Sequence, residues 1–203
     1  MLETKHKTMP ETQPETQLRT MLTQISSIID KTNASIGRAV AYGTLLMAII
    51  MFAVVVFRYG FDLGWIAMQE SITYVHAAVF LLGSAYTYQQ NSHVRVDVFY
   101  RRYSVKTKHI VDLCGCLFLL LPFACYVAIT CWSYVMQSWQ LLEGSREPGG
   151  LPFTYVLKSL MLIFAIMMIL QAISQIIKHS LSLLQASSKH ESAGHKGVTD
   201  ETY

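Results

Sequence analysis

The chain has 203 residues, of which 52% are hydrophobic and 14% are charged, and its formal net charge is +3. Soluble domains carry roughly 25% charged residues, so this composition excludes an ordinary soluble domain and indicates a membrane protein. The cations cluster beside apolar runs, which favours lipid headgroups and argues against a nucleic-acid partner.

Residues 1–16 form a polar segment with two prolines, for which we predict a disordered cytoplasmic tail. No apolar run with a small-residue cleavage site follows its lysines, so we do not expect a signal peptide. Residues 17–34 place apolar side chains at helical spacing opposite a polar face. This pattern predicts an amphipathic helix that lies in the membrane interface or braces a partner. The alternative is a cytoplasmic extension of the first spanning helix.

Residues 35–180 contain four apolar runs, which predict a domain of four transmembrane helices. The first run, 39–57, has 19 residues without a charge, and a helix of this length spans roughly 28 Å, about one hydrocarbon core. The second run, 71–88, follows Glu70 and carries small residues, which predict close contacts with other helices. His76, near its middle, is expected to be packed and hydrogen-bonded, because no intramembrane acid accompanies it.

The third run, 113–142, has 30 residues without a charge. A helix of that length measures roughly 45 Å, so it must tilt, protrude or break, and Pro122 can kink it. The four cysteines of the chain lie in this run without CxxC spacing and are predicted to be apolar packing residues. A tight turn, EGSREPGGLPF at 143–153, follows.

The fourth run extends from 154 to 177. Lys158, near its start, is expected to snorkel toward the headgroups. Gln171, Ser174 and Gln175 interrupt the apolar pattern and are predicted to hydrogen-bond a neighbouring helix. Residues 181–203 form a polar cytoplasmic tail, which we expect to be disordered from residue 186 onward.

The distribution of cations predicts the topology. Thirteen of the 16 Lys and Arg residues fall before the first run, between the second and third runs, or after the fourth. Cations close to span ends remain in the cytoplasm, so we expect an inner-membrane protein with both termini cytoplasmic. The predicted fold class is an all-α integral membrane protein, with four transmembrane helices and an N-terminal amphipathic interfacial helix.

The chain offers little chemistry of its own. It lacks the GxxxxGK[ST], HExxH, CxxC and GxSxG motifs, and we predict no catalytic residues, no cofactor and no metal site. None of the four runs contains an Asp or Glu, which a proton-coupled carrier would need. Because transport paths usually place polar groups near the midplane, this pattern favours a scaffold beside a transporter.

Three segments carry a resemblance to a known family. They are RYGFDLGWIAMQES after the first run, NSHVRVDVFYRR after the second and SWQLLEGSREPGGLPF after the third. Their order and spacing resemble the small permease subunit of tripartite ATP-independent periplasmic (TRAP) transporters, the DctQ-like family, over residues 35–178. The resemblance implies a scaffold packed against a large permease that moves by an elevator motion. It also implies a periplasmic substrate-binding protein, and sodium-driven uptake of a small organic-acid solute.

The resemblance implies that six residues, at positions that match the family's motifs, stabilise this chain's own structure or contact a partner. They are Arg58, Glu70, His93, Arg95, Asp97 and Glu143. Each has the alternative role of contacting a headgroup or capping a loop. For Arg95 and Asp97, intrachain structure and direct contact with the large permease both stay open. Two other classes remain: a membrane anchor that binds haem or quinone in a redox complex, and a small self-assembling exporter, which the missing intramembrane acid disfavours.

Overall fold

The structure is a computed structural model that describes residues 13–90 and 103–197, with side chains described for 17–90 and 103–185. All regular structure in this part of the chain is helical. The elements are α1 (Gln13–Gly60), α2 (Ile66–Gln89), α4 (Val105–Gly115), the π-helical turn η1 (Cys116–Leu120), α5 (Leu121–Gln140) and α6 (Thr154–Gly197). Four helical stretches within the described residues are long and apolar enough to cross a membrane. The all-α fold with four spanning helices is therefore confirmed.

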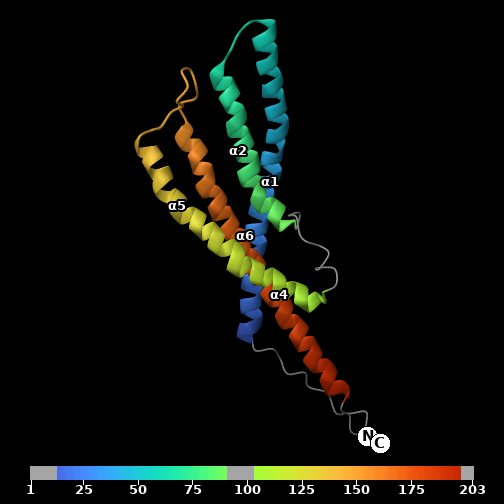
Figure 1. Cartoon of the computed structure of the whole chain (residues 1–203). Helices are drawn as coiled ribbons and strands as arrows, with labels where there is room; N and C mark the ends of the chain where they lie inside the picture. Colours follow the sequence, from blue (N-terminus) through green and yellow to red (C-terminus); the bar gives the residue numbers. More distant parts are fainter. Residues whose placement is uncertain (1–12, 91–102, 198–203) are drawn as a thin grey trace, which may run out of the picture.

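The helices form two antiparallel pairs (Figure 1). α1 packs along α2, and α5 packs along α6, while α1, α2 and α4 also contact α6. The start of α1 and the end of α6 lie toward the same end of the molecule, whereas the α1–α2 and α5–α6 turns lie toward the other. This arrangement is the one expected of four spans that alternate in direction.

α1 is one continuous helix of 48 residues. At 1.5 Å per residue it measures about 72 Å, more than twice the thickness of a hydrocarbon core. Residues 17–34 are helical, as predicted. No break separates them from the first span, and this continuity agrees with the alternative, in which the segment extends the first spanning helix. α1 also begins inside the segment predicted as a tail, and residues 1–12 lie outside the described part of the chain.

α6 likewise extends beyond its apolar run. It continues to Gly197, so the expectation of disorder from residue 186 is wrong as far as the described residues reach. Residues 198–203 lie outside them. α1 and α6 contact one another directly, and their printed hydrogen bonds join residues 26–33 of α1 to residues 171–178 of α6.

The third span runs without a gap from Val105 to Gln140 but changes its helical geometry midway. α4 ends at Gly115, a single π-helical turn covers Cys116–Leu120, and α5 begins one residue before Pro122. Proline lacks an amide hydrogen and its ring clashes with the carbonyl four residues earlier, and a widened π turn accommodates that defect. Cys116 is fully buried there, with its Sγ 2.9 Å from the Tyr88 hydroxyl, so it serves the packing role predicted for it.

Small residues set the helix spacing. The core lies where α2, α5 and α6 meet, around Ala85, Ala124, Met167 and Met168. Ala85 is one of the small residues predicted to face other helices, and it is completely buried. On α1, a Cβ at Gly37 would overlap the side chain of Tyr86. This glycine therefore allows α1 and α2 to approach closely.

Candidate functional site

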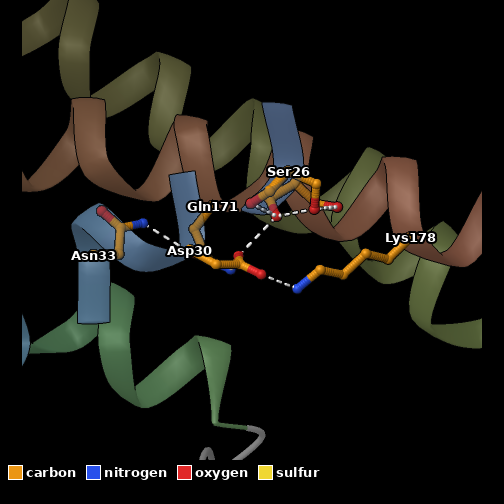
Figure 2. Close-up of polar contacts among 6 residues, drawn as sticks. Ser26, Asp30, Asn33, Gln171 and Lys178 are labelled. Atoms are coloured by element: carbon orange, nitrogen blue, oxygen red, sulfur yellow. Dashed lines mark hydrogen bonds and ion pairs between the residues drawn. The ribbon is translucent and has the colours of Figure 1, made fainter. Parts of the chain in front are cut away.

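A polar seam joins the N-terminal extension of α1 to the end of the fourth apolar run on α6. We define it as Ser26, Asp30 and Asn33 of α1 with Gln171, Ser174 and Lys178 of α6 (Figure 2). On each helix the three residues recur at steps of three or four, so they share one face. Neither the Asn33 nor the Gln171 side chain is more than 2% exposed. Since a buried polar group without a partner is costly, the seam is stable only if its members pair.

Asp30 is the hub of this seam (Figure 2). Its Oδ1 accepts hydrogen bonds from the Ser174 hydroxyl at 2.8 Å and from Gln171 Nε2 at 3.1 Å. Its Oδ2 forms an ion pair with the Lys178 ammonium. Asn33 Nδ2 donates to Gln171 Oε1 at 2.7 Å, and the hydroxyls of Ser26 and Ser174 lie 2.7 Å apart. The prediction of hydrogen bonds to a neighbouring helix is therefore confirmed for Gln171 and Ser174, and for Gln175, which is also buried, it stays a prediction.

A second polar cluster fixes the turn between α5 and α6. Glu70, at the start of α2, accepts hydrogen bonds from the Ser145 hydroxyl and, at 2.6 Å, from the Leu151 amide. The Ser145 amide in turn donates to the Leu151 carbonyl at 2.9 Å. The α2 carboxylate therefore closes a turn some 75 residues away along the chain.

The backbone geometry of this turn explains the two glycines of its Pro-Gly-Gly sequence. Gly149 has φ of +80°, a left-handed conformation that favours glycine. A Cβ at Gly150 would lie 2.7 Å from Glu70 Oε1 and would also overlap Ser145. Both glycines are thus required for the turn to meet the carboxylate of Glu70.

Glu143 fixes the same turn from its other end. Its Oε2 accepts a hydrogen bond from the Ser138 hydroxyl at 2.8 Å and pairs with the ammonium of Lys158. The Lys158 ammonium, followed by the Ser138 hydroxyl, holds the pKa of Glu143 below its usual value. Lys158 also lies 4.0 Å from the centre of the Tyr134 ring. The expectation that Lys158 snorkels to headgroups is wrong: its side chain is 13% exposed and pairs within the chain.

The six predicted residues thus divide into three groups. Glu70 and Glu143 hold one turn, so the loop-capping role applies to both. Arg58 is exposed and lines a recess of about 330 Å³ with Asp62 and Gln69, away from either cluster. The remaining three, His93, Arg95 and Asp97, lie outside the described residues.

His76 does not form the packed, hydrogen-bonded site that we expected. It is exposed on α2 and stacks on Phe80, with 6.3 Å between ring centres. The other histidine contact in the described chain joins His109 of α4 to His179 of α6, with their Nδ1 atoms 3.0 Å apart. Among the described residues no group of three or more His, Cys, Asp or Glu side chains could hold a metal ion.

Sequence reasoning missed the part that Asp30 plays in the seam. It placed Asp30 on the polar face of an amphipathic helix, but did not match that face to the polar residues of the fourth run. The signal was present, because Ser26, Asp30 and Asn33 step by four and then three residues, and Gln171, Ser174 and Lys178 step by three and then four. Two polar stripes of equal spacing on long helices can satisfy one another only by packing together.

Comparison with known proteins gave one family. The family model for tripartite ATP-independent periplasmic transporters, DctQ component, matches residues 47–181, about two thirds of the chain. The matched range contains Glu70, Glu143 and the α6 half of the seam, whereas Ser26, Asp30 and Asn33 precede it. No curated protein and no solved structure matches the chain.

Proposed function

The chain belongs to the DctQ family, the small permease component of TRAP transporters, and from this premise we propose that it is the static scaffold of a sodium-driven uptake system for a small organic-acid solute. DctQ components function with a large permease and a periplasmic binding protein. The family is a transporter component and not an enzyme family. The redox-anchor alternative is not favoured by this membership.

One observation carries the scaffold proposal: several polar side chains on the spanning helices pair within the chain. The hydroxyls of Ser84 and Thr130 donate to carbonyls four residues earlier, at 2.6 and 2.8 Å. Gln171 and Ser174 of α6 pair with α1. By contrast, the most apolar windows of α1 and α2 have none of their residues buried inside the described chain. Such helices offer apolar surface to lipid or to other helices, while a solute path needs polar groups that face a cavity.

We place both termini and the loop around Arg101 in the cytoplasm, with the α1–α2 and α5–α6 turns in the periplasm. The support is the concentration of 13 of 16 cations on one side of the four spans. In this placement the Glu70 and Glu143 cluster shapes a periplasmic turn and the seam braces cytoplasmic extensions. Labelling of a single cysteine at position 101 by an impermeant reagent from the periplasm would contradict it.

The residues outside the described part keep the role that the family resemblance implies. We propose that Arg95 and Asp97, with His93, form a cytoplasmic corner against the large permease or against the ends of this chain's own helices. Arg58 is proposed as a contact with headgroups or a partner at the periplasmic side. Paired Arg95→Ala and Asp97→Ala changes should then reduce uptake without changing which solute is chosen.

Tagged purification from the native membrane tests the assignment. A large permease should co-elute with the chain in mild detergent, and the purified complex should show no Soret band. A Soret band together with co-eluting redox subunits, in place of a permease, would overturn the proposal in favour of the redox anchor.

A further inference from the structure

A cationic recess lies beside the polar seam, where α1, α2 and α6 come together. Its volume is about 320 Å³, and side chains from all three helices line it. We refer to it as the basic recess and define it by six of its residues: Lys31, Ala34, Arg38, Gln89, Lys178 and Leu181. Neither the fold nor the scaffold role needs this recess to be basic.

Two of its cations have no counter-ion among the residues that the structure describes. The seam uses Asp30 to neutralise Lys178. Lys31 and Arg38, two turns apart on the same face of α1, are exposed and form no ion pair with any described residue. The basic recess therefore has an excess of two positive charges, which suits a ligand with a negatively charged phosphate.

The position of the recess along the spanning helices indicates the source of such a phosphate. Arg38 directly precedes the charge-free run 39–57, and Lys178 directly follows the fourth run. Gln89 is the last residue of α2. The recess therefore lies at the end of the spans, at the level of lipid headgroups. Ala34, Ile177 and Leu181 add an apolar wall, along which acyl chains can pack.

Gln89 supplies a second, independent observation. Its Oε1 is a buried side-chain oxygen without a hydrogen-bond partner, and the same side chain lines the basic recess. A buried acceptor left unpaired is destabilising. A ligand that brings a hydroxyl donor into the recess would satisfy it.

We propose that the basic recess binds an anionic phospholipid, with the phosphodiester held by Lys31 and Arg38 and a headgroup hydroxyl donating to Gln89 Oε1. A glycerol headgroup carries both the charge and the hydroxyls. Basic pockets between membrane helices bind anionic headgroups in this way. The site does not depend on the scaffold role, and the proposed topology decides only that the lipid comes from the cytoplasmic leaflet.

Native mass spectrometry of the full chain in detergent tests the site. The probes are dioctanoyl phosphatidylglycerol, dioctanoyl phosphatidylcholine and inorganic phosphate, each titrated separately. The test variant is K31Q/R38Q. The matched control is K106Q/R146Q, which removes the same two residue types at exposed positions that do not line the recess. Thermal unfolding verifies that both variants remain folded.

Phosphatidylglycerol should bind at least about fivefold more tightly than phosphatidylcholine. K31Q/R38Q should lose on the order of tenfold or more of that affinity, because each cation near the surface contributes about a factor of five. K106Q/R146Q should retain it. Equal binding of the two lipids, or equal losses in the two variants, would overturn the site. Binding of phosphate as tight as that of phosphatidylglycerol would assign it to a free anion instead of a lipid.

The Gln89 contact has its own test. Dioctanoyl phosphatidylmethanol has the same charge as phosphatidylglycerol but no headgroup hydroxyl. Wild type should prefer phosphatidylglycerol, and Gln89→Leu should bind the two lipids equally while still rejecting phosphatidylcholine. An unchanged preference in Gln89→Leu would overturn the assigned hydroxyl contact.

Discussion

The side-chain amide of Asn33 donates to the side-chain oxygen of Gln171 across 2.7 Å, joining two residues separated by 138 positions in the chain. Both side chains are buried, with exposures of 2% and 0%. This bond fixes the register between the α1 and α6 extensions, since sliding either helix would leave both amides unpaired. The seam therefore joins α1 and the end of the fourth apolar run of α6 into one packed unit.

Asp30→Asn should destabilise this unit. The change removes the charge that Lys178 pairs with, and exchanges one acceptor for a donor beside Gln171 and Ser174. We expect a loss of about 1–3 kcal/mol in the free energy of unfolding. Thermal unfolding of the full chain in detergent measures it. Asp62→Asn is the matched control, because Asp62 is exposed and asparagine tolerates its left-handed φ of 55°. Equal unfolding temperatures for the two variants would contradict the hub role of Asp30.

Gly150→Ala should loosen the turn between α5 and α6. The added methyl group would displace Ser145 or the Glu70 carboxylate, and overpacking of this kind costs about 1–3 kcal/mol. Faster proteolysis within 143–153 reports the loosening. Gly64→Ala, on the turn between α1 and α2, has open space around its Cβ and should behave as wild type. A turn as resistant in Gly150→Ala as in wild type would show that Glu70 does not hold it.

The Glu143 contact should stabilise the turn in a pH-dependent way. Because Lys158 and Ser138 lower the pKa of Glu143 in the folded chain, the folded state binds its proton less readily than the unfolded state. The stabilisation is therefore complete above the ordinary glutamate pKa of about 4.3. It is lost as the pH falls through the lower folded value.

Comparison with Glu143→Gln isolates this contribution. Wild type should unfold at a higher temperature than the variant at pH 6, and the difference should shrink below about pH 4. A difference that stays constant down to pH 3 would mean that the ionised carboxylate is not the stabilising group.

The apolar edge of the α1 extension should act outside this chain. Ile25 and Ile28 are 46% and 65% exposed, so replacing both with Asp should leave the unfolding temperature of the isolated chain unchanged. Burial of an isoleucine against lipid or a partner is worth about 1.5–3 kcal/mol. The double variant should therefore recover less of the large permease on co-purification. Gln24→Asp, an exposed change on the same helix, is the control, and equal recovery in both would show that this edge has no partner or membrane contact.

Features that depend on local pattern were predictable from the sequence. The four spans follow from runs without charge. The π-helical turn before Pro122 lies in the run that is too long for the bilayer. Gln171 was expected to pair because an amide in an apolar helix must find a partner. Glu70 and Glu143 were identified by resemblance, and their loop-capping alternative agrees with the turn they hold.

Features that depend on which faces meet were not predictable in the same way. A glycine lowers helix propensity, yet Gly37 lies inside a continuous helix because Tyr86 packs against its bare Cα. The partner of Asp30 is more than 140 residues away, and only the tertiary packing of α1 on α6 selects it. His76 was expected to be packed, but the face of α2 that carries it turns away from the other described helices.

Reconstitution into liposomes under a sodium gradient tests the scaffold claim most directly. Three samples are compared: this chain alone, the large permease with its binding protein, and all components together. We predict sodium-driven uptake only in the complete sample. Uptake by this chain alone, or full uptake without it, would contradict its assignment as a required scaffold that does not itself carry solute.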